Sequence, residues 1–444
     1  MFIKSAVMPV LAAASAHSVD VSPPMMLPFG TLLLLIAIGP LAFPRWWHRN
    51  YPKVSLGLGL LTACYYFFVL KHGERLLHVA HEYVSFIALI GSLFVVAGGI
   101  HITVKGESRP LINVLFLFVG AVMANIIGTT GASMLMIRPW IRMNRYRITA
   151  FHVVFFIFIV SNVGGCLTPL GDPPLFLGYL KGVPFLWVIA NCWKAWLIVV
   201  GTLLGVFYIL DSLNFRQPPK EVSDRMTGSE KWHFAGHHNI FFVAVIVGGV
   251  LANRLLPPLV PDAIMVGAAA ASFVSTPKPV HELNDFNFDP IKEVAWLFAG
   301  IFATMVPVID YLELHAGELG LHSAQQFYWA TGTLSAFLDN APTYLTFLAA
   351  AMGDQGLSVN SGQDVGRFIE QSNDFLVAIS LAAVFFGAVT YIGNGPNFMV
   401  KNIAQQVGVR TPSFFGYVLR YAVPVLIPIF ALVSLLFFSR WRVF

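Results

Sequence analysis

Two apolar stretches of this sequence are interrupted by residues that stop a helix, and these interruptions constrain the fold more than any other feature. The first interruption, at residues 165–176, reads GCLTPLGDPPLF, and the second, at residues 387–398, reads GAVTYIGNGPNF. Proline has no backbone N–H and its ring clashes with the preceding turn. Each stretch therefore predicts two short helices joined by unwound backbone.

The composition of the rest of the chain predicts that these interruptions lie in a membrane. Only 11% of the residues are charged and 57% are hydrophobic, whereas ordinary soluble domains carry about 25% charged residues. We expect an all-α polytopic membrane protein with about ten or eleven spanning helices. The predicted spans are 28–43, 54–70, 83–103, 149–177, 185–210, 239–254, 259–275, 291–310, 375–400 and 413–438.

Two further apolar stretches, 111–137 and 324–352, carry small and polar residues in their middle. The first contains ANIIGTTG and the second contains SAFLDNAP. A continuous spanning helix has no use for such a centre, whereas two half-length helices that meet at a polar tip do. Both stretches predict re-entrant hairpins.

The chain repeats this pattern with opposite topology. A shift of 222 positions pairs Gly165 with Gly387, Thr168 with Thr390 and Asp172 with Asn394, and a shift of 211 pairs the two hairpins. Equal order with inverted entry predicts two inverted repeats with one broken helix each. The predicted divisions are an N-terminal segment (1–27), the first repeat (28–210), a cytoplasmic loop (211–238) and the second repeat (239–444).

Basic residues concentrate in alternate loops, such as the loop with Arg142, Arg145 and Arg147, while the loops at 311–323 and 353–374 are mainly acidic. By the positive-inside rule we expect both termini outside, in a bacterial inner membrane. Residues 1–16 resemble a cleavable signal peptide, with a frayed amphipathic N-terminus as the alternative.

Several other functions are not supported by the sequence. The net charge of +5 comes from loops between apolar spans, so it does not indicate nucleic acid as a partner. The three cysteines build no disulfide framework. No P-loop motif appears, so we expect no nucleotide and no cofactor other than a coupling ion, Na⁺ or H⁺.

Asp172 is the residue whose position most directly suggests a function. A charged carboxylate near the bilayer centre costs at least ~2.5–3.5 kcal/mol. Next to freed backbone carbonyls it would bind Na⁺, because hard cations prefer oxygen ligands. It could carry a proton when the ion is absent, since loss of water disfavours the charged form. The alternative is a simple N-cap, because Pro173 and Pro174 follow it.

The second membrane carboxylate is Asp339, at the predicted tip of the second hairpin, with a surface turn as the alternative interpretation. We expect Na⁺ at Asp172 and Asp339. Neutral polar residues of the tips and interruptions complete two pseudo-symmetric sites, although each alone could serve only helix packing. The candidate ion- or substrate-binding residues are Asn125, Thr129, Thr130, Ser161, Asn162, Thr168, Gly171, Asp172, Asp339, Asn340, Thr343, Thr390, Asn394 and Asn397.

These motifs resemble the ion transporter superfamily, which includes D-type sodium/proton antiporters, citrate transporters, arsenite-pump membrane subunits and divalent-anion/sodium symporters. The matching residues are NVGGCLTPLGDPP from Asn162, LDN from Leu338 and IGNGPN from Ile392. The resemblance covers roughly residues 85–430. It implies a scaffold subdomain with homodimer contacts and a mobile subdomain that holds the hairpins and broken helices and moves like an elevator.

The hairpin tips depart from the Ser-Asn-Thr tips of the carboxylate symporters, and the first tip lacks the acidic residue of the antiporters. An Asp at both a tip and a break favours a sodium/proton antiporter that moves a small ion. The alternative is a cation-coupled citrate or dicarboxylate transporter that moves a small organic anion. We expect no enzymatic activity, and the remote alternative is a metalloenzyme that uses His72, His78, His81 and Glu82.

Overall fold

The computed structural model describes residues 19–103, 109–215 and 233–439. The signal-like segment predicted at 1–16 lies outside them. Nearly all regular structure in the described residues is helical, and eight of their helices are long and apolar enough to cross a membrane. The prediction of an all-α polytopic membrane protein is therefore confirmed.

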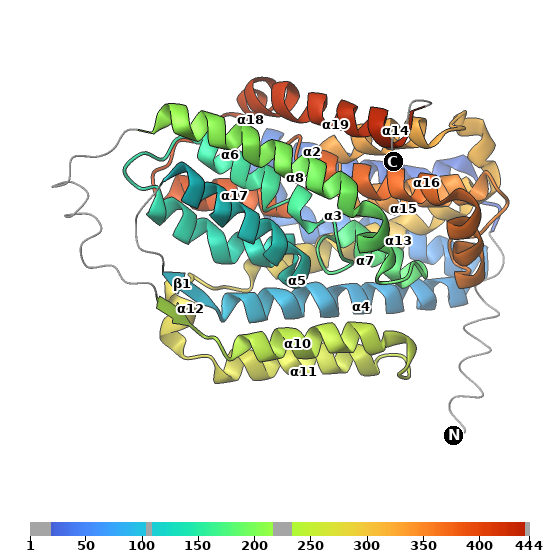
Figure 1. Cartoon of the computed structure of the whole chain (residues 1–444). Helices are drawn as coiled ribbons and strands as arrows, with labels where there is room; N and C mark the ends of the chain where they lie inside the picture. Colours follow the sequence, from blue (N-terminus) through green and yellow to red (C-terminus); the bar gives the residue numbers. More distant parts are fainter. Residues whose placement is uncertain (1–18, 104–108, 216–232, 440–444) are drawn as a thin grey trace.

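In each half, a hairpin is followed by a broken helix and then by a final helical segment, and Figure 1 shows how these helices are arranged. The first half contains α2 (Leu27–Ala42), α3 (Pro44–Cys64), α4 (Gly73–Gly98), α5 (Pro110–Met143), α6 (Ala150–Ile159), α7 (Pro173–Lys181) and α8 (Trp187–Asn214). The second half contains α10 (Asn239–Leu251), α11 (Val260–Ser275), α12 (Lys278–Leu283), α13 (Asp289–His315), α14 (Ala324–Phe337), α15 (Asn340–Gly353), α16 (Gly362–Phe386), α17 (Gly395–Gln406), α18 (Phe414–Tyr417) and α19 (Val423–Phe437).

Short elements complete these helices. They are the 3₁₀ turns η1 (Pro23–Met26), η3 (Val163–Gly165), η4 (Ala252–Arg254) and η5 (Ala316–Leu319), and the π-helical turns η2 (Tyr65–Val69) and η6 (Val418–Ala422). The division into repeats at 28–210 and 239–444 stays a prediction.

The helix α5 is a hairpin, because its backbone leaves helical geometry at Gly128 (φ 77°, ψ 156°). This positive φ is readily available only to glycine. Residues on the two arms then meet: the rings of Phe116 and Trp140 lie 5.6 Å apart. Asn113 Nδ2 donates to Asn144 Oδ1 over 2.8 Å. In the second half, α14 and α15 form the corresponding hairpin around the extended residue Leu338.

Both broken helices restart with a proline in their first turn. The first leaves helical geometry after α6 and resumes as α7, and the second breaks between α16 and α17. Proline suits this position because its missing N–H would have no helical partner there. The two breaks end in the residues that the repeat pairs, Asp172 and Asn394.

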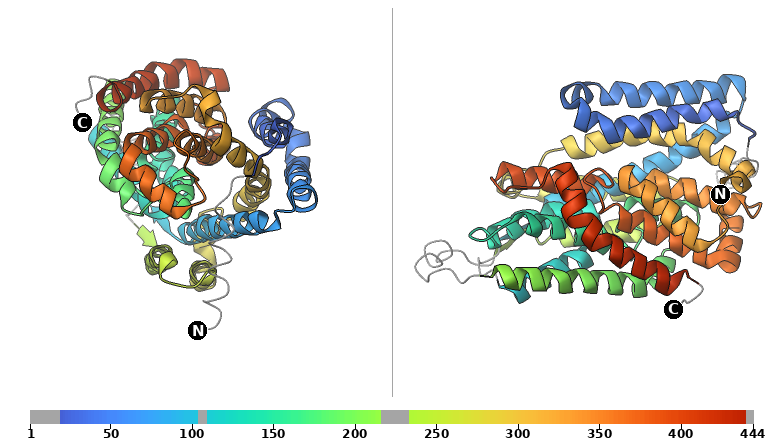
Figure 2. Two further views of the ribbon diagram at one scale, coloured as in Figure 1. Left: turned by 90° about the vertical axis from the view of Figure 1, so that its right-hand side faces the viewer. Right: turned by 90° about the horizontal axis from the view of Figure 1, so that it is seen from above.

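The helices form two packed units (Figure 2). We name residues 27–98 and 239–315 the scaffold, in which α13 packs on α3 and α4, and α11 packs on α4. We name residues 110–214 and 324–437 the site unit, which holds both hairpins and both broken helices. The units meet where α4 contacts α5 and α7, and where α13 contacts α15.

The molecule has two ends along the helix axes (Figure 1). We name the end with the α5–α6 and α17–α18 connections the basic end. The opposite end, with the α13–α14 and α15–α16 connections, is the acidic end. Both hairpins reach from one end toward the middle of the molecule, α5 from the basic end and α14–α15 from the acidic end.

Several helices extend beyond the predicted spans. The helix α4 begins at Gly73 instead of residue 83, α3 begins at Pro44 instead of residue 54, and α16 begins at Gly362 inside the predicted acidic loop. In α4 the added turns bury Arg75 and Glu82, whose charges are paired with Asp310 and Lys181. In α3 and α16, exposed side chains such as Arg49 and Arg367 can keep their charged heads in water while the helix continues past its apolar run.

The predicted loop 211–238 also contains regular structure where it is described. It holds the last turn of α8 and β2 (His233–Ala235), which pairs antiparallel with β1 (His101–Thr103). The prediction that residues 101–103 end a span was therefore wrong, because they form a strand next to the basic end of α4.

Candidate functional site

The side chain of Asp172 lies where both hairpin tips and both broken helices meet. Its Oδ1 accepts hydrogen bonds from Thr129 Oγ1 (2.8 Å) and Asn394 Nδ2 (3.0 Å). Its Oδ2 accepts one from Asn340 Nδ2 (2.5 Å). We name these four residues the carboxylate cluster. The structure thus brings together four of the candidate residues, one from each of the four interrupted elements.

Local backbone geometry aims Asp172 into this cluster. The residue is extended (φ −146°, ψ 144°), as expected before a proline. Its carbonyl starts α7 by accepting from Leu175 N (3.1 Å), but its side chain makes no capping hydrogen bond to that helix. The carboxylate is therefore free to face the hairpins, and the N-cap interpretation does not describe it.

Asn394 has the same local geometry in the second half. It is extended (φ −152°, ψ 139°), stands two residues before Pro396 in the first turn of α17, and makes no side-chain cap. Its Nδ2 donates to Ser161 O (3.2 Å) as well as to Asp172. The second break therefore presents an amide donor where the first break presents a carboxylate.

No basic side chain in the described part of the chain forms an ion pair with the carboxylate of Asp172. Asp172 is 1% exposed, and the ion pairs formed within residues 19–103, 109–215 and 233–439 do not include it. Its three hydrogen-bond donors are all neutral. A buried charge without a partner is costly. Either a bound cation or a proton on the carboxylate would remove that cost.

A small cavity adjoins the cluster. It has a volume of about 30 Å³ and is lined by the first hairpin tip (127–131), the first break (169–173) and apolar residues of α4. That volume holds a water molecule or a bare ion. Thr130 is among the lining residues, and none of the lining residues is basic.

The first break is held by the arm of its own hairpin. Asn125 Nδ2 donates to Gly164 O (2.6 Å), and Asn125 Oδ1 accepts from Leu167 N (2.7 Å). Thr168 Oγ1 donates to Asn125 O (2.6 Å). The carbonyl of Gly171 accepts from Thr129 N (2.8 Å), which fixes the hairpin tip beside Asp172. Asn125, Thr168 and Gly171 therefore position the cluster.

The second break is held by Asn397, whose Nδ2 donates to Gly387 O (2.8 Å) and Thr390 O (2.9 Å). Asn397 Oδ1 accepts from Asn162 Nδ2 (2.7 Å), which joins the two breaks directly. Thr390 Oγ1 donates to Ala336 O on the second hairpin. These bonds place both breaks and both hairpins in one polar core.

Two atoms near the junction of the breaks extend this core. Asn162 Oδ1 is buried and has no hydrogen-bond partner among the residues that the structure describes. The hydroxyl groups of Ser161 and Ser133 lie 2.7 Å apart. Ser133 was not among the predicted residues, because a serine inside an apolar helix arm carries no sequence signal that separates it from ordinary packing.

Asp339 occupies a different position from Asp172. Its Oδ1 accepts from Ala341 N (3.0 Å), so its side chain caps α15, and Thr343 Oγ1 donates to its carbonyl (2.8 Å). The residue is half-buried at the tip of the second hairpin. The structure therefore places Asp339 and Thr343 beside the cluster, and neither donates to or accepts from the Asp172 carboxylate.

The histidine-rich segment of α4 does not assemble a metal site in the described residues. No group of three His, Cys, Asp or Glu side chains with metal-binding placement occurs there. Glu82 is instead paired with Lys181 Nζ (2.7 Å), with His78 Nε2 at 3.2 Å. The metalloenzyme hypothesis has no support in this geometry.

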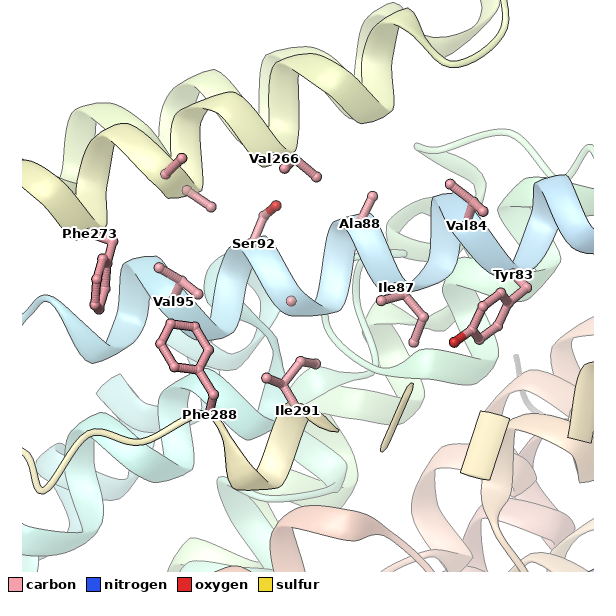
Figure 3. Close-up of a pocket in the computed structure, with 13 residues that line it drawn as sticks. Tyr83, Val84, Ile87, Ala88, Ser92, Val95, Val266, Phe273, Phe288 and Ile291 are labelled. Carbon is pink, nitrogen blue, oxygen red and sulfur yellow. The ribbon is translucent and has the colours of Figure 1, made fainter. Parts of the chain in front are cut away.

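A larger cavity of about 500 Å³ lies in the scaffold between α4, α11 and the start of α13 (Figure 3). Its lining is almost entirely apolar, with Val84, Ile87, Val95, Val266 and Phe273 among the residues drawn there. It lacks the convergent polar groups that would recognise an ion or a carboxylate. The larger of these two cavities is therefore not the candidate ion site.

Comparison with known proteins gives one result for the whole chain. A family model described as putative citrate transport matches residues 18–438, which include the scaffold and the site unit. A search of curated proteins finds no match.

Proposed function

The chain belongs to the family described as putative citrate transport, and we propose that this membrane transporter exchanges Na⁺ for H⁺ at Asp172. The observation that carries the proposal is the position of the Asp172 carboxylate. It is buried, has no basic partner in the described residues, and receives its hydrogen bonds from all three of the other interrupted elements.

The chemistry of the cluster supports competition between the two cations. When Na⁺ is bound, the Asp172 carboxylate and the hydroxyl oxygen of Thr129 would supply oxygen ligands of the kind that a hard cation prefers. Asn340 and Asn394 would add their amide oxygens once these turn toward the ion, in place of the Nδ2 groups that donate to Asp172 in this structure. When Na⁺ leaves, a proton on Asp172 removes the buried charge. Because one carboxylate holds either cation but not both, movement of one ion is coupled to movement of the other.

Transport also requires that the cluster reaches both sides of the membrane in turn. Asp172 is buried in this structure, so a part of the protein must move. The division into scaffold and site unit supports an elevator-like step, in which the site unit slides as one body past α4 and α13. All members of the cluster lie in the site unit, so they would move together.

We further propose that the basic end faces the cytoplasm of a bacterial cell, with both termini outside. The connections rich in arginine and lysine lie at that end, as the positive-inside rule requires.

The second candidate function is cation-coupled citrate or dicarboxylate transport, which the family description favours. The helices α7 and α17 begin in the site unit, and their N-terminal amides could bind a carboxylate. Thr130 and Asn397 would assist. A cavity of about 30 Å³ is too small for citrate, so this function needs the hairpins to open.

Flux measurements on the purified protein in liposomes test the two functions. Internal pH is followed while Na⁺, Li⁺, K⁺ and citrate are added in turn, for the wild type and for Asp172→Asn. Antiport predicts proton movement on adding Na⁺ alone and its loss in the variant. Proton or sodium movement that appears only with citrate would replace antiport by the citrate function.

A further inference from the structure

A buried ion pair joins the site unit to the scaffold near the acidic end. Lys181, the last residue of α7, places Nζ 2.9 Å from Oε2 and 2.7 Å from Oε1 of Glu82 on α4. Lys181 and Glu82 are 6% and 5% exposed. Lys181 Nζ also donates to Asn360 Oδ1 (2.9 Å), in the connection between α15 and α16.

The contact continues from Asn360 to the second scaffold helix. Asn360 Nδ2 donates to Oε1 of Glu313 on α13 (3.2 Å), and Val359 N donates to the same oxygen (2.7 Å). Ser358 Oγ donates to Glu313 as well (3.0 Å). The scaffold helices α4 and α13 therefore each present a buried carboxylate to the site unit, and the site unit binds both.

We propose that the Glu82–Lys181 ion pair is a clasp that holds the site unit in the position seen here and must open for transport. The proposal rests on the elevator-like movement of the proposed function. The clasp identifies Glu82 and Lys181 as the residues that determine how the site unit is distributed between its two positions.

The sequence of α4 beyond Glu82 explains why the clasp acts in one position only. Toward the basic end, the side of α4 that faces the site unit continues with Phe86, Leu89 and Leu93, all buried and apolar. The Phe86 ring lies 6.5 Å from that of Phe176 on α7. A slide of one helical turn, about 5.4 Å, would take Lys181 off Glu82 and onto this apolar surface. An unpaired ammonium there is strongly unfavourable.

The basic end has no comparable clasp among the described residues. There the ion pair between the two units is Arg138–Asp285 at 3.2 Å, and the Asp285 side chain is 79% exposed. Exposed pairs of this kind contribute little. Among the residues that the structure describes, ionic contacts between the units are therefore unequal at the two ends, and the buried ion pair lies at the acidic end.

The test measures the distance between the two units by double electron–electron resonance. Spin labels are placed at Leu77→Cys on α4, where the side chain is exposed, and at Gly366→Cys on α16, which has open space around it, after Cys64, Cys166 and Cys192 are replaced. The clasp is removed by Glu82→Leu with Lys181→Met, which leaves no orphaned charge.

We expect a second distance in this double variant, with a population ratio at least about tenfold above that of the wild type. The reversed pair, Glu82→Lys with Lys181→Glu, should return the ratio toward the wild-type value. The matched control is Arg75→Met with Asp310→Asn. It removes a buried pair (2.6 Å) between α4 and α13 inside the scaffold, and should lower stability without changing the distance.

Two results would overturn the clasp, and they differ in what they say about transport. If the wild type shows two distances and the Glu82–Lys181 variants keep the same ratio, the clasp is wrong and the elevator step stands. If all variants show one distance under Na⁺, at low pH and during turnover, the rigid-body movement fails and the clasp fails with it.

Discussion

The two breaks share one construction but differ in charge. Thr168 of the first break donates to the carbonyl of Asn125 on the first hairpin, and Thr390 of the second donates to the carbonyl of Ala336 on the second hairpin. These four residues correspond under the repeat shifts of 222 and 211 positions. The framework of the site is therefore built twice, while the carboxylate occurs only in the first copy.

The breaks also satisfy their backbones with different asparagines. Asn125 binds the first break from the hairpin, whereas Asn397 binds the second break from the helix that follows it. The repeat pairs Asn125 with Ala336, whose side chain cannot form hydrogen bonds to the second break. Equal backbone folds do not require equal side chains, provided that every freed carbonyl at membrane depth finds a donor.

The second half of the molecule supplies hydrogen-bond donors to the carboxylate of the first half. Asn340 and Asn394 stand at the second tip and the second break, and both donate to Asp172. A single charge shared between the halves avoids two carboxylates in one buried site, which could not both be ionised. We infer that the site has one coupling carboxylate, not two.

Neutralising each membrane carboxylate in turn tests whether Asp172 alone carries the coupling charge. Asp172→Asn should reduce Na⁺-driven proton flux to the rate of protein-free liposomes, because the exchanged charge is gone. Asp339→Asn should stay within about threefold of the wild type, since asparagine caps a helix as well as aspartate does. Equal loss in both variants would show that two carboxylates carry the ions and that the inferred asymmetry is wrong.

Moving the carboxylate from the first break to the second tests whether the two breaks are interchangeable. In Asp172→Asn with Asn394→Asp, the carboxylate would stand 3.2 Å from the carbonyl of Ser161, where the amide of Asn394 now donates. It would also lose Thr129 as a donor. We expect flux at least about tenfold below the wild type, since one lost charged hydrogen bond costs roughly 1.5–3 kcal/mol.

The control for this exchange is Asn394→Asp alone, which places two carboxylates in contact. Because two carboxylates in contact cannot both be ionised, the pair should retain a proton to higher pH than a single carboxylate does, and the optimum of its flux should shift to higher pH. Full activity of the exchanged double variant would mean that the two breaks are functionally equivalent.

Glycines at matched positions of the breaks should differ in tolerance. A Cβ at Gly171 would lie 2.0 Å from the carbonyl oxygen of Gly165, whereas a Cβ at Gly393 would lie 2.8 Å from those of Gly387 and Ser335. Backbone atoms cannot easily move aside, so we expect Gly171→Ala to cost about 3 kcal/mol or more and Gly393→Ala about 1–2 kcal/mol.

Thermal unfolding of the purified variants measures this difference. The control is Gly395→Ala, because a Cβ at Gly395 meets nothing within 4 Å; its midpoint should match the wild type. If Gly171→Ala and Gly393→Ala unfold at the same temperature, the first break is no more tightly packed than the second.

Much of this architecture could be predicted from the sequence, because its signals are local. Glycine and proline together disfavour a continuous helix, so residues 165–176 and 387–398 indicated unwound backbone without knowledge of their neighbours. The signal is not absolute, because α2 continues through Gly39 and Pro40. The tip at Gly128 followed from small and polar residues in an apolar stretch. Helix ends were less predictable, since α4 and α16 continue through charged residues that the apolar run excludes.

The contacts within the site could not be predicted, because they depend on how distant elements meet. In the sequence, Asp172 and Asp339 are equivalent candidates, because both are carboxylates in apolar stretches. Only the packed structure shows that one faces three donors while the other caps its own helix. The Glu82–Lys181 pair is separated by 99 positions, and no spacing rule connects two such residues.

The smallest predicted effect concerns a threonine hydroxyl that both breaks contain. Thr168→Val and Thr390→Val each remove one hydroxyl that donates to a hairpin carbonyl, over 2.6 Å and 2.5 Å. Loss of the donated bond should cost about 1 kcal/mol in each variant. Thr390→Val should lower the unfolding midpoint further than Thr168→Val, because the Thr390 hydroxyl also accepts from Ile392 N (3.2 Å) and Gly393 N (3.1 Å). Thr346→Val, which removes a bond within α15 (2.8 Å), is the control for loss of any hydroxyl. A larger loss at Thr168 alone would mean that the hairpin is anchored chiefly at the charged break, so that the asymmetry extends from the carboxylate into the framework itself.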